Sequence, residues 1–156
     1  MIIEIAHFAL VLALAVALIL SVVPVIGAVR RDAAMMAMAS TGSLVLFSLV
    51  AFSFGVLTWA YVVSDFSVKN VWENSHSLMP LLYKYTGVWG NHEGSMLLWL
   101  LIIVLFSALV VMFGKNLPET LKANVLAVQA WIASAFLMFI LLPSNPFTRL
   151  DPAPAE

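Results

Sequence analysis

We predict an all-α integral membrane protein with four transmembrane helices, from its composition and from the distribution of its charged residues. Of the 156 residues, 63% are hydrophobic and only 10% are charged, whereas soluble domains carry roughly 25% charged residues. The four intervals that contain no Asp, Glu, Lys or Arg are Phe8 to Val29, Ala33 to Ser64, Gly94 to Gly114 and Ala123 to Thr148. Each interval is long enough for a helix that crosses about 30 Å of hydrocarbon, which takes roughly 20 residues. Backbone groups in lipid must be paired within a helix or a closed barrel, and no strand-like alternation suggests a barrel.

The first two helices are expected over residues 6–28 and 41–63. In the first, Ala9, Ala13 and Ala17 recur every four residues and form a face of small side chains that allows close helix contact. The methionines at positions 35, 36 and 38 lie before the second helix, with no His or Cys nearby. They therefore favour packing or interfacial anchoring over soft-metal binding.

The last two helices are expected over residues 95–114 and 123–142. Their hydroxyl and amide side chains, among them Ser107, Gln129 and Ser134, are of the kind that join neighbouring membrane helices by hydrogen bonds. No Asp, Glu, Lys or Arg lies inside any of the four spans. A proton relay or an ion pathway within this unit is therefore not expected.

The basic residues predict the orientation. Those on one side of the predicted helices are Arg30, Arg31, Lys115 and Lys122, and those on the other are Lys69, Lys84 and Arg149. Cytoplasmic loops are enriched in Lys and Arg, and neither residue precedes the first helix. We therefore place both termini, the external loop 64–93 and the external tail 143–156 on the outer, periplasmic side. A cleaved signal peptide is disfavoured, because the basic n-region is missing and the first apolar run is too long.

Composition also limits the chemistry. There is no cysteine, which excludes disulfides, thiolate metal sites and a cysteine nucleophile. The net charge of -1 and the lack of a basic patch exclude nucleic acid as a partner, whereas the lipid bilayer is a required one. No nucleophile–base pair or paired carboxylates occur at a workable spacing, so we assign no catalytic residue and no metal site.

The stretch "VWGNHEGSMLLW" (residues 88–99) places a histidine and a glutamate between two tryptophans, directly before the third helix. Glu93 and Ser95 can cap the free N–H groups of that helix, which is a sufficient structural role. For His92 two roles remain open, a haem or metal ligand and a hydrogen-bonding group. The candidate supporting residues for a cofactor are His92, Trp89, Glu93 and Trp99.

The external loop is also rich in aromatic side chains that suit the lipid headgroup level. Those at or near it are Tyr61, Trp72, Tyr83, Tyr85 and Trp89. Amphipathic rings at this level anchor membrane proteins, so we interpret most of this aromatic content as an anchor belt and not as a ligand site.

Four segments together resemble a known family. They are "AHFAL" (6–10), "TWAYVVSDFSVKNVWENS" (58–75), "LMPLLYKYTGVWGNHEGSMLLW" (78–99) and "SNPFTRL" (144–150). In this combination the chain resembles the N-terminal part of the CcmF/NrfE family of cytochrome c haem lyases, which are multi-pass inner-membrane proteins of bacterial c-type cytochrome maturation. The resemblance covers nearly the whole chain and is more specific than a short motif match.

The resemblance implies haem as the cofactor and a role at the outer face of the membrane. Such proteins receive haem from a haem chaperone, act with other cytochrome c maturation membrane proteins, and join haem vinyl groups to the two cysteines of an apocytochrome c site. The family's tryptophan-rich "WWD" segment and its haem-ligating histidines have no counterpart here. None of those ligands can therefore be assigned to this chain, which we do not expect to be catalytic alone.

We therefore interpret residues 1–156 as one N-terminal transmembrane unit of a longer or split protein. Its expected role is to support haem handling and haem attachment to apocytochrome c. The alternative is a membrane scaffold or transporter subunit without haem binding, which composition does not distinguish from the first. An enzyme complete in this chain is the least favoured interpretation.

Overall fold

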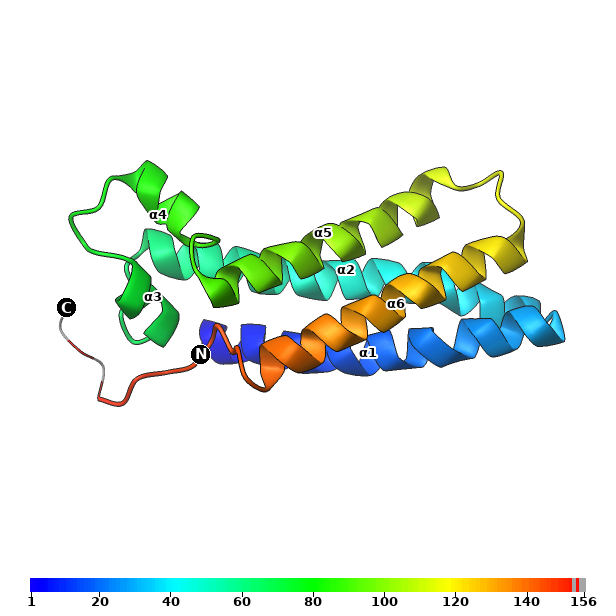
Figure 1. Ribbon diagram of the computed structural model, residues 1–156, viewed down its shortest axis with the longest axis horizontal. Coiled ribbons are helices and arrows are strands. Elements are labelled where there is room, and N and C mark those ends of the chain that lie inside the picture. The colour runs from blue at the N-terminus through cyan, green and yellow to red at the C-terminus, as the bar shows by residue number, and fades with distance from the viewer. Residues whose placement is uncertain (153, 155–156) are drawn as a thin grey trace.

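The computed structural model describes residues 1–152 and 154, and in this part of the chain all regular elements are helices apart from one isolated bridge. The helices are α1 (Ile2–Arg30), α2 (Ala33–Val62), α3 (Lys69–Asn74), α4 (Leu81–Gly87), α5 (His92–Phe113) and α6 (Glu119–Leu141). The four long helices α1, α2, α5 and α6 run along one another in an elongated bundle (Figure 1). All four are long and apolar enough to cross a membrane, which confirms the predicted class. The predicted tail ends outside the described residues.

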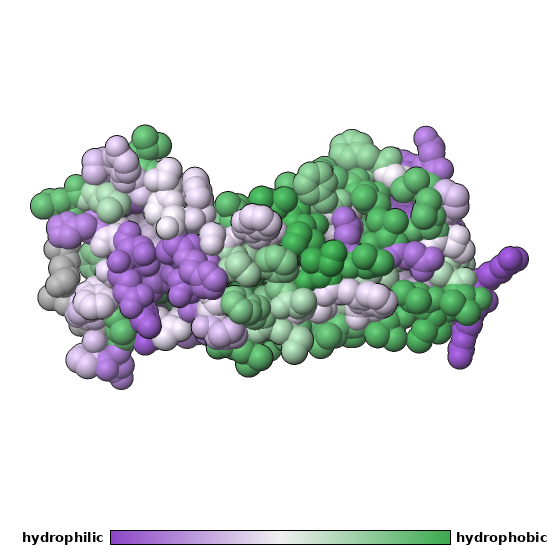
Figure 2. All heavy atoms as spheres, viewed as in Figure 1, coloured by the Kyte–Doolittle hydropathy of each residue, from purple (hydrophilic) through white to green (hydrophobic). Residues whose placement is uncertain are grey.

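The surface of the bundle matches this class. Figure 2 shows a broad apolar band across the middle of the face in view, with hydrophilic side chains gathered towards the two ends of the molecule. α5 and α6 have 22 and 23 residues and are about 33–35 Å long at 1.5 Å per residue. They are therefore just long enough to cross the hydrocarbon, whereas α1 and α2, with 29 and 30 residues, are about 10–15 Å longer than it is thick.

Helices α1, α2, α5 and α6 all begin before the predicted starts, and α2 differs most. It begins at Ala33 rather than at residue 41, because the Asp32 carboxylate accepts hydrogen bonds from the backbone N–H groups of Ala34 and Met35 at 2.9 and 3.2 Å. An acidic N-cap of this kind pairs N–H groups that would otherwise lack a partner. The methionines at 35, 36 and 38 are consequently part of the helix.

The small-residue face of α1 packs as expected. Ala9, Ala13 and Ala17 are all buried, and α1 packs against α2 and α6. Near its first turns, Ser53 of α2 donates a hydrogen bond to the Ala6 carbonyl oxygen at 3.0 Å. Between α5 and α6, Ser107 donates to the Gln129 side-chain oxygen at 2.9 Å. Trp131 Nε1 of α6 also donates to the Ser21 carbonyl oxygen of α1. Interhelical hydrogen bonds therefore join three pairs of neighbouring helices within the bundle.

The segment 64–93, expected as a loop, is largely structured. It contains α3 and α4, and Val68 forms an antiparallel bridge with Arg149. In this bridge the Lys69 N–H donates to the Thr148 carbonyl oxygen and the Leu150 N–H donates to the Ser67 carbonyl oxygen, both at 2.9 Å. The connection therefore folds back onto the segment after α6, at the end of the bundle where the first residues of α1 also lie (Figure 1).

Candidate functional site

A largely buried polar cluster lies where α2, α3 and the start of α5 meet. We call its three members, Tyr61, Asn70 and Asn91, the outer cluster, because they lie near one end of the bundle and not in its middle. The Tyr61 hydroxyl donates to Asn70 Oδ1 at 2.7 Å, Asn91 Nδ2 donates to the Tyr61 oxygen at 2.9 Å, and Asn70 Nδ2 donates to Asn91 Oδ1 at 2.9 Å. Tyr61 is fully buried and Asn70 nearly so. Each member therefore satisfies the polar groups of the other two, which matters because an unpaired buried group is costly.

Asn91 also begins α5. Its side-chain oxygen accepts from the Gly94 N–H at 2.8 Å, and its Nδ2 donates to the Gly87 carbonyl oxygen at 2.9 Å. The chain turns so tightly here that a Cβ on Gly94 would overlap the Val88 carbonyl oxygen. Only glycine fits at this position, because it has no Cβ. The glycine and the asparagine of the "WGNHEG" stretch together fix the start of the membrane helix.

The expected capping by Glu93 and Ser95 is wrong, because Asn91 is the N-cap of α5. Glu93 lies in the first turn, and its Oε2 accepts from Asn70 Nδ2 at 3.3 Å. A carboxylate at a helix N-terminus is favourable towards the helix dipole. Ser95 donates to the His92 carbonyl oxygen at 2.9 Å, so it bonds within the helix and does not cap it.

The other candidate residues are on the surface. His92 is exposed, and its ring contacts Phe139 of α6 edge-on, with centroids 5.8 Å apart. Trp89 and Trp99 are 43% and 63% exposed. Of the four candidates, the structure therefore connects only Glu93 to the outer cluster. Among the described residues, no group of three or more His, Asp or Glu side chains is placed to hold a metal ion.

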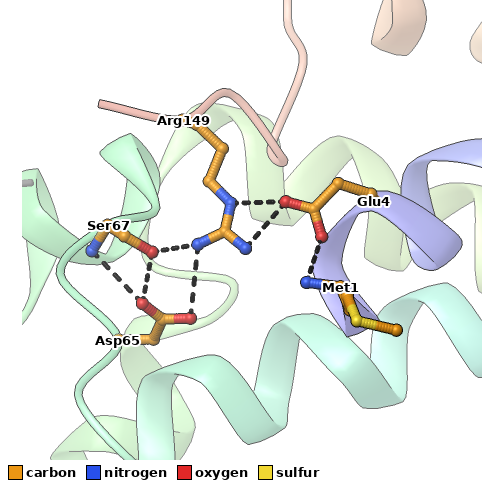
Figure 3. A network of polar contacts seen from close by, with 5 residues as sticks. All are labelled: Met1, Glu4, Asp65, Ser67 and Arg149. Carbon is orange, nitrogen blue, oxygen red and sulfur yellow. Dashed lines mark hydrogen bonds and ion pairs between the residues drawn. The ribbon is translucent and has the colours of Figure 1, made fainter. Parts of the chain in front are cut away.

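A second polar group, which no motif in the sequence predicted, centres on Arg149 (Figure 3). The Arg149 guanidinium contacts Glu4 Oε1 at 2.9 and 2.8 Å and Asp65 Oδ2 at 3.7 Å, and it also donates to the Ser67 hydroxyl. Glu4 in turn pairs with the Met1 ammonium group at 2.5 Å. We call this group the arginine junction. It joins the start of α1, the segment after α2 and the segment after α6.

All four segments that carry the resemblance contribute to this end of the bundle. Besides the outer cluster and the arginine junction, His7 Nδ1 lies 3.3 Å from the Asn145 side-chain nitrogen. The motifs are far apart in sequence, and hydrogen bonds and ion pairs bring them together in space. The fold and site thus define a polytopic helical membrane protein with a structured polar assembly at one end.

The comparisons with known proteins give the family. The chain is 72% identical over 156 residues to the cytochrome c-type biogenesis protein CycK of Rhizobium meliloti, covering 100% of the chain and 23% of that protein. It is 47% identical over 152 residues to the cytochrome c-type biogenesis protein CcmF of Pseudomonas aeruginosa, covering 97% of the chain and 23% of the relative. No protein-family model matches.

A solved structure has the same fold. The cytochrome c haem lyase CcmF superposes with a TM-score of 0.87 at 27% identity, over 94% of this chain and 25% of the other. The chain therefore belongs to the CcmF/NrfE family of cytochrome c-type biogenesis proteins, which confirms the predicted resemblance. It spans about a quarter of the length of the relatives that it matches.

Proposed function

We propose that this chain is the N-terminal helical unit of a haem lyase component, which supports haem handling and haem attachment to apocytochrome c. The observation that carries the proposal is the near-complete match to CycK and CcmF proteins, in sequence and in fold. Haem is the cofactor of the whole protein. A haem chaperone, other cytochrome c maturation membrane proteins and apocytochrome c are its partners.

The contribution of this unit is structural, because it provides a rigid surface next to the part of the protein that handles haem. The outer cluster fixes the start of α5 against α2 and α3, and the arginine junction fixes the three chain segments beside it. Glu93 accepts a hydrogen bond from Asn70 and so helps to hold it in place. The side chains of His92, Trp89 and Trp99 are exposed. We assign these three residues a supporting role towards haem or the neighbouring helices.

The orientation that fits this role puts the outer cluster and both termini in the periplasm of an inner-membrane protein. The distribution of Lys and Arg supports this orientation, because four of these residues, Arg30, Arg31, Lys115 and Lys122, are at the opposite end of the bundle and only three, Lys69, Lys84 and Arg149, are at this end. The test is a pair of reporter fusions in the full-length protein, one in the loop 114–118 and one in the loop 75–80. A periplasm-specific reporter is expected to be active only in the second, and the opposite pattern would overturn the assignment.

The function is tested in a bacterial strain that lacks the gene of the full-length protein. Holocytochrome c is measured as covalently attached haem on denaturing gels, and we expect it to be lost in the strain and restored by the wild-type gene. His92→Ala is expected to lower it several-fold with the protein amount unchanged, whereas His76→Ala, also at an exposed position, leaves it at wild-type level. Normal holocytochrome c in the deletion strain would favour the alternative, a scaffold or transporter subunit without haem binding.

The four-helix unit by itself is not expected to hold haem stoichiometrically. The reason is that the family's haem ligands are expected outside this chain. Absorbance of the purified chain after haem addition measures this directly. A Soret band of one haem per chain that disappears in His92→Ala would instead make His92 a haem ligand.

A further inference from the structure

A patch of apolar side chains is exposed on and just before the short helix α4. Its members are Leu78, Leu81, Leu82 and Tyr85, which are 87%, 55%, 69% and 42% exposed, and we call them the leucine patch. Leu81, Leu82 and Tyr85 share one face of α4 at the i, i+1 and i+4 positions. No residue of α4 is buried. The described residues of this chain therefore leave the leucine patch uncovered.

The side of α4 that faces the bundle is polar or small. α4 packs mainly against α2, and Lys84 Nζ donates to the Ser64 hydroxyl, directly after α2, at 2.6 Å. Lys84 is also the only Asp, Glu, Lys or Arg between Glu73 and Glu93 in the sequence. A helix on the surface of a soluble domain has the opposite arrangement, with its apolar face on the core and its charges in water. The outer side of α4 is therefore suited to contact with another apolar surface.

The leucine patch lies at a hydrophilic end of the bundle and not in its apolar band. Figure 1 shows the start of α4 and the connection before it farther from the middle of the bundle than the start of α5. Hydrophilic side chains gather at that end of the molecule (Figure 2). Exposure of apolar surface to water is unfavourable, and contiguous apolar patches on a polar surface mark interaction sites. The position thus favours a protein surface as the cover of the patch.

The segment after α6 indicates which protein surface is close by. The chain spans 23% of the CycK relative and 23% of the CcmF relative, so most of such a protein lies outside it. The segment after α6 returns to the end of the bundle that carries α4, where Leu150 N–H donates to the Ser67 carbonyl oxygen at 2.9 Å and Arg149 forms the bridge with Val68. Polypeptide that follows this segment therefore starts beside the connection that leads to α3 and α4. Tethering makes its docking an intramolecular event, which favours it over a separate partner of equal affinity.

We propose that the leucine patch is the docking site for an apolar segment of the polypeptide that follows residue 156 in the full-length protein. The inference rests on the proposed function, because it takes this chain as the N-terminal unit of a longer haem lyase component. The docking segment is expected to present aliphatic or aromatic side chains without a charge at the contact, because an unpaired charge buried against leucines is costly. Docking holds the later part of the protein against α4 and, through the contact of Lys84 with Ser64, against the end of α2.

The test is site-specific photo-crosslinking in the purified full-length protein, in lipid nanodiscs without apocytochrome c or other maturation proteins. Benzoylphenylalanine replaces Leu78 or Leu82 in separate variants, and the cross-linked peptides are identified by mass spectrometry. The control position is Asn116, which is exposed in the loop at the opposite end of the bundle. We expect both leucine positions to cross-link to peptides beyond residue 156 of the same polypeptide, and Asn116 not to cross-link to these peptides.

Products with lipid would overturn the proposal, because the patch would then lie in the bilayer. Products with a second copy, or no protein product at all, would overturn it as well, and so would the same peptides from Asn116. A second measurement uses the smaller change Leu82→Cys, in a background without other reactive cysteines. Its reaction with a water-soluble maleimide is expected to be several-fold slower in the native protein than after unfolding in SDS, and equal rates would contradict docking.

Neither measurement involves haem or cytochrome c, so the docking and the proposed function fail separately. An exposed leucine patch in a protein that restores holocytochrome c to the deletion strain would overturn the docking alone. Normal holocytochrome c in the deletion strain, together with the expected cross-links, would contradict only the role in haem attachment.

Discussion

Substitution of Gly94 tests whether the tight turn before α5 holds the outer cluster together. In Gly94→Ala the added Cβ would overlap the Val88 carbonyl oxygen and lie 2.8 Å from the carbonyl carbon. Both atoms belong to the backbone, so they move only if the turn opens. An opened turn separates Asn91 from the Gly94 N–H and from Tyr61, and the cap and one contact of the outer cluster are lost together.

The expected cost combines two effects. Overpacking of a well-packed site costs about 1–3 kcal/mol, and loss of an N-cap costs about 1 kcal/mol. We therefore expect the free energy of unfolding to fall by about 2–4 kcal/mol. The assay is unfolding of the purified protein in mixed micelles by increasing SDS content, followed by circular dichroism.

Gly55→Ala is the matched control, because Gly55 is also in a long helix but no atom lies within 4 Å of the position of an added Cβ. Alanine has a higher helix propensity than glycine by about 0.8–1.0 kcal/mol, so this variant is expected to be as stable as the wild type or more stable. An unfolding midpoint of Gly94→Ala equal to that of the wild type would refute the reasoning. Equal losses in both variants would refute it as well.

The remaining predictions concern polar contacts at and near the same end. Tyr61→Phe leaves the side-chain oxygen of the buried Asn70 without its hydrogen-bond donor, whereas Asn91 Nδ2 keeps the Gly87 carbonyl oxygen. This variant is expected to cost about 1–3 kcal/mol in the same unfolding assay. Tyr83→Phe, at an exposed ring, is expected to change stability by less than about 0.5 kcal/mol. Ser53→Ala removes the hydrogen bond to α1 and is expected to lower the free energy of unfolding by about 0.6 kcal/mol. The control is Ser48→Ala, because the Ser48 hydroxyl bonds only within its own helix. An equal cost for both variants would contradict a stabilising role of the Ser53 hydrogen bond between α2 and α1. Arg149→Ala is expected to change the free energy of unfolding little, because the ion pairs of Arg149 are partly exposed. It is expected to speed amide hydrogen exchange in residues 65–69 and 147–150. Unchanged exchange in these residues would show that the arginine junction does not hold the two segments together.

The resemblance and the four spans were accessible from the sequence, but the site was only partly accessible. Glu93 and Ser95 were expected to cap α5, although the neighbouring Asn91 is also of a residue type that is strongly preferred at helix N-caps. The structure assigns the cap to Asn91, because its side chain reaches the N–H three residues on and the outer cluster at once. A signal was present in the sequence, since an asparagine three residues before a glycine at a helix start suits a tight cap. The partners Tyr61 and Asn70 gave no such signal, because they lie far from Asn91 in the chain.

The sequence by itself determined that this chain has four helices long and apolar enough to cross a membrane, because charge is excluded from hydrocarbon and a helix pairs its own backbone groups wherever it lies. Both conditions are local, because each uncharged interval meets them through its own residues, without contacts to the rest of the chain. Only the tertiary structure decided that the segment 64–93 folds into α3 and α4, that Arg149 joins three distant parts of the chain, and that α4 turns its leucines outwards. These features depend on contacts between residues that are distant in sequence. Such contacts can stabilise the fold only when the packed long helices bring these residues together at one end of the bundle.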